Sequence, residues 1–272
     1  MYIMKKFISA LLTAVVIMGT FAACSSDSDD KTITVGASVT PHSEILAVAQ
    51  EILVEKGYTL EIKIFNDYIL PNTATESGEL DANYFQHQPY LDHFNAEHGT
   101  NLVSIADLHY ELFALYPGKT TSLADLADGA TIAVPNDGTN EARALALLEA
   151  EGLITLRPNT GLTATVMDIA SNPKNLNILE MDAAMLARSL EDVDLAVING
   201  NYAMQAGLSA NTDAVAVEDK SSDVARTFRN VLVVKSGNEN NTALVALKEA
   251  LTSDKVREAM ETLYDGIVIP MF

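Results

Sequence analysis

Short apolar runs rich in β-branched residues alternate along this chain with segments whose apolar residues recur every three or four positions. Residues 32–38 predict a strand, and the spacing of Ile45, Ala49 and Leu53 predicts a helix from 42 to 57. The same two patterns continue to the C-terminus. Further strands are predicted at 59–65, 81–85, 102–106, 131–135, 176–180, 195–199 and 230–234, and helices at 89–97, 140–151, 185–191 and 242–264.

Strands separated by helices favour an α/β fold with parallel sheet built from βαβ units. No flexible linker interrupts the pattern, yet one sheet would hold this many strands poorly. We therefore expect two α/β lobes, with the chain crossing at 112–118 and returning at 228–232, and a ligand cleft between them. The expected division is residues 32–115 plus 230–272 for lobe 1 and 116–229 for lobe 2.

The N-terminal segment has the layout of a secretory signal peptide over residues 1–23, with Lys5 and Lys6 before an apolar run that ends in small residues. Cys24 is the only cysteine of the chain and follows this run directly, so it has no disulfide partner. It resembles the acylated cysteine of bacterial lipoproteins, and the Ser- and Asp-rich residues 24–31 then form a flexible tether. An ordinary signal peptide or an uncleaved helix would still indicate export.

Charge and motif content exclude several classes of function. The net charge of -20 disfavours nucleic-acid binding. None of the five histidines lies at a zinc-binding spacing, and the one cysteine is assigned to the anchor. No nucleophile elbow or phosphate-binding loop is present. We therefore expect no catalytic residue, no metal and no cofactor.

Three segments could carry ligand chemistry. The densest is 81–91, where alternation along a strand sends Phe85 and His87 to one face and Tyr84 and Gln86 to the other. An aromatic ligand pocket and an ordinary core strand end both fit this pattern.

In the second segment, 134–143, Asn140 and Arg143 share one face of a helix start, where free N–H groups and a guanidinium favour an anion. The alternative is a surface arginine paired with Glu141 or Glu149. In the third segment, Asn199 ends an apolar strand where α/β sheets meet ligands, and Asn230 repeats the pattern. A turn role for Asn199 is equally consistent.

From residue 33 to the C-terminus the chain resembles the MetQ/NlpA family of methionine-binding lipoproteins, the substrate-binding proteins of bacterial ABC importers. The resemblance rests on six segments in the family's order. They are FNDY at 65–68, GELDANYFQH at 78–87, VPNDGTN at 134–140, NPKNL at 172–176, RSL at 188–190 and AVIN at 196–199.

The resemblance implies a type II periplasmic-binding-protein fold that closes on L-methionine or a related amino acid or short peptide. It implies that Arg143 holds the ligand carboxylate and that Asn140, Asn199 and Asn230 bind its carboxylate or ammonium. Tyr68, Phe85 and His87 would form the side-chain pocket, with Tyr84 and Tyr90 as weaker candidates. Permease and ATPase chains would be partners on an exported protein anchored through Cys24. An interaction lipoprotein without a transporter, or an enzyme on the same scaffold, are the alternatives.

Overall fold

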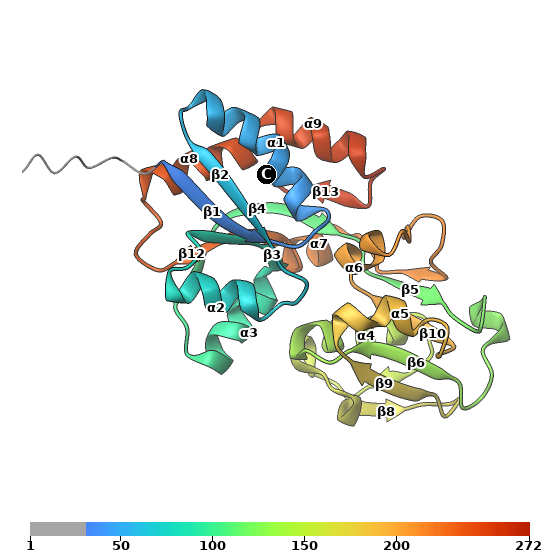
Figure 1. The fold of residues 1–272 in the computed structure, drawn as a ribbon. Helices are drawn as coiled ribbons and strands as arrows, with labels where there is room; N and C mark the ends of the chain where they lie inside the picture. Colours follow the sequence, from blue (N-terminus) through green and yellow to red (C-terminus); the bar gives the residue numbers. More distant parts are fainter. Residues whose placement is uncertain (1–30) are drawn as a thin grey trace, which may run out of the picture. The chain divides into compact units, whose positions relative to one another are not determined.

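The computed structural model describes residues 31–272, which form one compact unit built on two sheets (Figure 1). The signal peptide, Cys24 and nearly all of the expected tether lie outside the described residues. The first sheet has six strands. In order across the sheet they are β13 (Val268–Pro270), β4 (Leu102–Glu111), β12 (Asn230–Lys235), β3 (Ala82–His87), β1 (Thr32–Ala37) and β2 (Thr59–Ile64).

Helices cover both faces of the first sheet, whose central strands β12, β3 and β1 are mostly buried. On one face, α1 (His42–Glu55) packs with α8 (Thr242–Leu251) and α9 (Asp254–Leu263) over Val35, Tyr84 and Leu232. On the other, α2 (Leu70–Ser77) and α3 (Gln88–His98) pack against β3, with Phe85 and Phe94 in the apolar cluster. Figure 1 shows these two helix groups above and below the sheet.

The second sheet has five strands. Alternation along residues 131–135 sends Ile132 and Val134 into one apolar cluster, and Ala133 into the cluster that contains Leu186 and Tyr202. The elements of this part are β11 (Ala216–Val217), β5 (Ala114–Pro117), β10 (Leu195–Ile198), β6 (Thr131–Pro135) and β9 (Asn177–Met181) in sheet order, with α4 (Gly138–Ala150), α5 (Leu186–Ser189) and α6 (Gly200–Gln205). The small β7 (Thr155–Leu156) and β8 (Ile169–Ser171) pair separately, and α7 (Ser222–Thr227) precedes β12.

The expected parallel pairing is found between β1 and its neighbours β2 and β3 and between β6 and its neighbours β9 and β10, but not at the strands that join the two sheets. The strand β12 runs antiparallel to β3 and β4, and β5 runs antiparallel to β10. The chain leaves the first sheet after Glu111, enters the second at Ala114 and returns at Asn230. A strand that returns from the other sheet need not follow the right-handed crossover that makes βαβ units parallel.

The helix predicted at 242–264 is two helices, because α8 ends at Leu251 and Ser253 caps α9 by accepting a hydrogen bond from the Val256 N–H. The helix α2 was not expected from the sequence, which has few apolar residues there.

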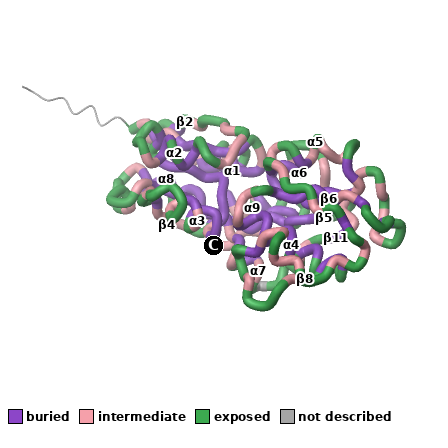
Figure 2. The backbone as a smooth tube through the Cα atoms, turned by 90° about the horizontal axis from the view of Figure 1, so that it is seen from below, coloured by how far each residue is buried: buried purple, intermediate pink, exposed green. Residues whose placement is uncertain are grey.

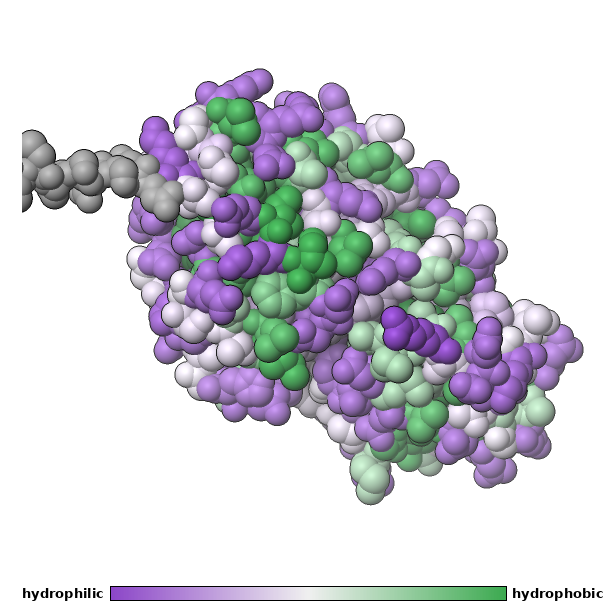
Figure 3. All heavy atoms as spheres, viewed as in Figure 1, coloured by the Kyte–Doolittle hydropathy of each residue, from purple (hydrophilic) through white to green (hydrophobic). Residues whose placement is uncertain are grey.

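Buried residues run through the interior of both sheets (Figure 2), whereas polar and apolar side chains mix on the face shown in Figure 3. No helix within 31–272 is both long and apolar enough to cross a bilayer.

Candidate functional site

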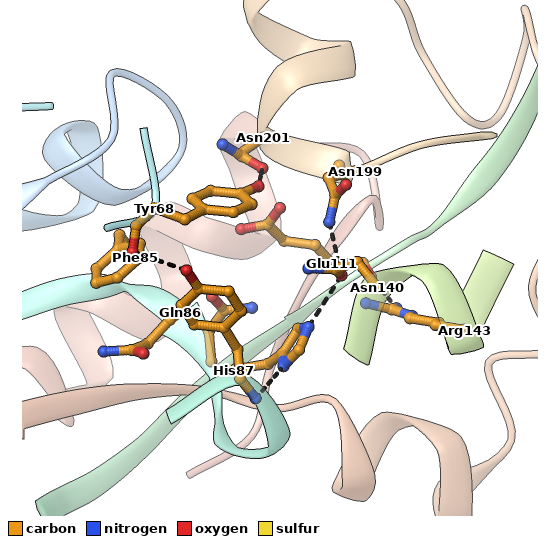
Figure 4. Close-up of a pocket in the computed structure, with 12 residues that line it drawn as sticks. Tyr68, Phe85, Gln86, His87, Glu111, Asn140, Arg143, Asn199 and Asn201 are labelled. Carbon is orange, nitrogen blue, oxygen red and sulfur yellow. Dashed lines mark hydrogen bonds between the residues drawn. The ribbon is translucent and has the colours of Figure 1, made fainter. Parts of the chain in front are cut away.

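A small cavity of about 20 Å³ lies where strand ends of the first sheet meet helix starts of the second. This space holds about one water molecule, so a larger ligand requires the lining to move apart. All seven ligand-binding residues expected from the sequence line it, although their contact with a ligand stays a prediction (Figure 4). The lining is Tyr68, Phe85, Gln86, His87, Tyr90, Glu111, Asn140, Arg143, Asn199, Gly200, Asn201 and Asn230.

One end of the cavity is walled by aromatic rings. The Tyr68 ring lies 5.8 Å from Phe85, 5.7 Å from Tyr90 and 5.1 Å from Tyr202, between centroids. The Tyr68 hydroxyl donates to Asn201 Oδ1 at 2.6 Å, and the Tyr90 hydroxyl donates to the Tyr68 carbonyl at 3.0 Å. These hydrogen bonds satisfy the polar ends of the rings, so their apolar edges and faces are available to a ligand side chain.

His87 connects the aromatic end to the polar end. Its Nδ1 accepts the Tyr90 backbone N–H at 3.1 Å and caps α3, so the proton of the neutral ring is on Nε2. Nε2 then donates to Asn140 Oδ1 at 3.1 Å. Burial lowers the pKa of His87 to about 3, with the Arg143 charge adding to the effect. Both ring nitrogens of His87 therefore have partners in the protein, and a ligand can make only van der Waals contact with the ring.

The asparagines at the polar end are held by the protein on one side. Asn140 Nδ2 donates to both Asp137 carboxylate oxygens, at 2.9 and 3.0 Å, and Asn199 Nδ2 donates to Asn140 Oδ1 at 2.8 Å. Asn199 Oδ1 and Asn201 Nδ2 are buried, and neither has a hydrogen-bond partner within the described residues. Buried polar atoms are almost always satisfied, so these two amides are well placed to bind a ligand.

Arg143 is buried and already has an anionic partner, which is Glu218 rather than Glu141 or Glu149. Its Nη2 lies 2.5 Å from Glu218 Oε2, and its Nε donates to the same carboxylate at 2.9 Å. Nη2 also donates to the Glu111 carbonyl at 3.2 Å, so Nη1 is the nitrogen that these oxygens leave free. The expectation that Arg143 lies in the first helical turn is wrong, because Asp137 caps α4 and starts it at Gly138.

Aromatic rings also contact the guanidinium. The Arg143 Cζ lies 4.5 Å from the Phe113 centroid and 4.3 Å from the Phe228 centroid. Such contacts orient a planar cation as well as stabilise it. Phe113, Phe228 and Glu218 were not identified from the sequence, because their role depends on contacts between distant segments.

Tyr84 does not belong to the cavity lining, which corrects its place as a weaker pocket candidate. It is fully buried on the opposite face of β3, and its hydroxyl hydrogen bonds to His109 Nδ1. Behind the cavity, His109 and His42 both contact the carboxylate of Glu111. Glu111 lines the cavity and was also missed, because no motif in the sequence contains it.

Comparison with known proteins gives consistent matches. The sequence model of the NlpA lipoprotein family matches residues 33–272. The methionine-binding lipoprotein MetQ of Bacillus subtilis is 41% identical over 275 residues, covering 98% of each chain. The D-methionine-binding lipoprotein MetQ of Escherichia coli K12 is 40% identical, covering 95% of this chain and 94% of its own.

Solved structures agree with the sequence matches. A nutrient-binding protein from Burkholderia cenocepacia, solved with methionine bound, is 41% identical and matches with a TM-score of 0.84, covering 88% of this chain and 100% of its own. Lipoprotein Tp32 from Treponema pallidum is 43% identical, with a TM-score of 0.84 over 89% of this chain and 100% of its own. These matches confirm the expected two-lobe α/β fold.

The buried histidines predict that the folded protein loses stability as the pH falls from 7 to 5. Burial lowers the pKa of His42 to about 4 and those of His87 and His109 to about 3. The unfolded chain therefore takes up protons below about pH 6.5 that the folded chain does not. Each histidine should cost roughly 1 to 2 kcal/mol across this range, measured as the free energy of unfolding in urea.

Burial raises the pKa of Glu111, Asp137 and Glu141, which acts in the opposite direction and offsets part of the loss. The variant His87→Gln cannot take up a proton and should have a shallower dependence on pH. His98→Gln changes an exposed histidine and serves as the control. An unchanged slope in His87→Gln would show that His87 is not kept neutral by burial.

Proposed function

The chain belongs to the NlpA lipoprotein family, and we propose that it is a lipid-anchored substrate-binding protein of an ABC importer. It captures methionine, or a closely related amino acid or short peptide, and delivers it to separate permease and ATPase chains. The observation that carries this proposal is a single cavity with an aromatic wall at one end and a buried arginine with unpaired amide atoms at the other. A free amino acid such as methionine likewise has a charged head group at one end and an apolar side chain at the other.

The ligand carboxylate is assigned to the polar end. Nη1 of Arg143 makes no hydrogen bond to Glu218 or to the Glu111 carbonyl, which accept from Nε and Nη2. A charge-assisted hydrogen bond from a guanidinium to a carboxylate is stronger than a bond between neutral groups. Phe113 and Phe228 fix the guanidinium before the ligand arrives, which reduces the entropy lost on binding.

The ligand side chain is assigned to the aromatic end. A thioether gains roughly 0.3 to 1.5 kcal/mol from sulfur near aromatic edges, and its unbranched chain fills irregular space. The rings of Tyr68, Phe85 and Tyr90 offer such edges, whereas a charged side chain would lose its hydration among them. Methionine therefore fits this wall better than an acidic or basic amino acid.

The cavity lining favours binding over catalysis. The residues that line it include no serine, threonine, cysteine or lysine that could act as a nucleophile. His87, the imidazole in the lining, has both ring nitrogens hydrogen-bonded to the protein. The relatives with stated ligands are named as binding proteins, which supports a receptor rather than an enzyme.

Arg143→Ala should weaken methionine binding at least about a hundredfold, because it removes the charged partner of the ligand carboxylate. Isothermal titration calorimetry measures this loss. Arg157→Ala on the exposed surface of the same part of the chain is the matched control and should bind normally. A nearly unchanged affinity in Arg143→Ala would show that Arg143 does not bind the ligand carboxylate.

The single variant also leaves Glu218, whose side chain is 11% exposed, without its partner, which could unfold the protein. The double variant Arg143→Met with Glu218→Gln removes both charges together. It should fold, judged by circular dichroism, and still bind methionine at least about a hundredfold more weakly than the unchanged protein. Restored affinity in this folded double variant would equally contradict the assignment.

Selectivity should follow the chemistry of the aromatic wall. At matched concentrations methionine should raise the melting temperature most, leucine less because it lacks the sulfur contact, and glutamate or lysine least. A thermal-shift series measures the order. Equal stabilisation by glutamate or lysine would contradict an apolar side-chain pocket. A dipeptide that raises the melting temperature more than methionine would agree with this pocket, and it would show that the part of the site that binds the charged head of the ligand is larger than a single amino acid needs.

Cys24→Ser should abolish lipid attachment and leave an unprocessed precursor or a species that is released from the membrane. Membrane fractionation with mass measurement of the mature chain distinguishes these products. A substitution at the neighbouring Ser25 is the control and should leave attachment unchanged. A Cys24→Ser protein that is retained on the membrane at the normal mature mass would require a different anchor.

A further inference from the structure

Four polar side chains are buried together where α2 packs against β3. Asn72, Thr75 and Asn83 are fully buried, and Gln86 is 4% exposed. A buried amide or hydroxyl is costly unless it is hydrogen-bonded. These four residues, the amide network, therefore need hydrogen-bond partners within the protein.

The direction of the hydrogen bonds in the amide network follows from one backbone carbonyl. The Thr75 hydroxyl lies 2.8 Å from the Pro71 carbonyl oxygen, which can only accept, so Thr75 donates its proton there. The Thr75 oxygen then accepts from Asn83 Nδ2 at 2.8 Å. This contact identifies the nitrogen of the Asn83 amide, so Asn83 Oδ1 is an acceptor and takes a hydrogen bond from Gln86 Nε2 at 2.8 Å.

Asn72 closes the amide network into a ring. Its Oδ1 accepts from Asn83 Nδ2 at 3.0 Å and from Gln86 Nε2 at 2.6 Å, and its Nδ2 donates to Gln86 Oε1 at 2.9 Å. Every oxygen and nitrogen of the three amides therefore has a partner inside the protein. A buried network that is fully satisfied fixes the relative position of the elements that carry it, because hydrogen bonds are directional.

The helix α2 has little apolar surface with which to pack against the sheet. Its buried apolar residues are Pro71 and Ala74, and Leu70 is 55% exposed. At its C-terminal end the Lys235 ammonium donates to the Glu76 carbonyl at 2.6 Å. Hydrogen bonds therefore hold α2 in place, where an amphipathic helix would rely on an apolar face.

The two elements joined by the amide network also carry two rings of the aromatic wall. Tyr68 comes two residues before α2, and the Asp67 carboxylate accepts two backbone N–H groups of the turn into this helix, at 2.8 and 2.7 Å. On β3, Phe85 lies between Asn83 and Gln86 in the sequence. The amide network thus holds the segment of Tyr68 against the strand of Phe85, and the centroids of these two rings lie 5.8 Å apart.

We infer that the amide network sets the width of the side-chain pocket, because it fixes the separation of Tyr68 and Phe85. Asn72 and Thr75 are then positioning residues, which act through Tyr68 and are not part of the cavity lining. This inference rests on the proposed function and adds to it how the length of the ligand side chain is selected. A wall held at one width discriminates against a side chain that is one methylene too long.

Thr75 is suited to a test because its side chain can be changed without touching the cavity. Thr75→Val keeps the approximate shape of the side chain and removes the hydroxyl, so Asn83 Nδ2 loses a partner. Thr75→Ser keeps the hydroxyl and is the conservative variant. Thr73→Val is the matched control, because Thr73 is exposed on the same helix and its hydroxyl donates to the Ile69 carbonyl four residues earlier, just as Thr75 donates to Pro71.

Asn72→Leu is a more severe change, which replaces the central amide by an apolar group of similar size. Circular dichroism and the melting temperature establish that each variant is folded. Calorimetry then measures the dissociation constants of L-methionine and of L-ethionine, whose side chain is one methylene longer. The ratio of the two constants reports the width of the pocket, because both ligands have the same charged head.

The unchanged protein should bind methionine at least about tenfold more tightly than ethionine, as expected for one methylene in a pocket of fixed width. Thr75→Val and Asn72→Leu should each reduce this ratio by about threefold or more, because the wall can then widen. Thr75→Ser and Thr73→Val should keep the ratio of the unchanged protein. An amide network that contributed only stability would lower the melting temperature on substitution and leave the ratio as it is.

A ratio that is unchanged in folded Thr75→Val would overturn this inference and leave the proposed function in place. Equal binding of methionine and ethionine by the unchanged protein would do the same. Thr75→Val decides alone if Asn72→Leu, which leaves buried amides without partners, does not fold. Absence of methionine binding by the unchanged protein would overturn the proposed function together with this inference.

Discussion

The ion pair between Arg143 and Glu218 determines what the polar end of the cavity can bind. Both side chains are largely removed from water, and the guanidinium donates from Nε and Nη2 to Glu218. A buried guanidinium without such a partner would be strongly destabilising, so the protein supplies the anion itself. The charge of Arg143 is therefore largely balanced before any ligand arrives. A simple anion gains less from this site than a ligand that also brings a positive group.

The two sheets contact each other across the cavity through hydrogen bonds between side chains. Tyr68 of the first part donates to Asn201 of the second, and His87 bonds Asn140 in the same way. The lining is thus assembled only when both parts are together. A ligand as large as an amino acid has to enter before these bonds form or after they break, which agrees with capture by closure of two lobes. The division of the chain into lobes at residues 115 and 230 stays a proposal.

Sequence patterns predicted the features that depend on local periodicity or on ordered motifs. Alternation along residues 81–87 placed Phe85 and His87 on one face, and the structure has Phe85 and Tyr84 in different apolar clusters. The strand β12 was predicted, but its antiparallel direction was not, because its neighbours come from distant segments. Glu218 was missed for the same reason, since 75 residues separate it from Arg143. The helix α2 was missed because its buried polar residues are held by side chains of β3, and no local pattern records that.

The most direct test of the proposed function is to identify the ligand that the protein carries from the cell. The processed chain, purified without added amino acids, is analysed by native mass spectrometry and again after unfolding, when bound small molecules are released. We expect a released molecule that carries a free ammonium, a carboxylate and an apolar side chain, with the mass of methionine as the main species. A released molecule without an amino group, or with a charged side chain, would contradict the proposal.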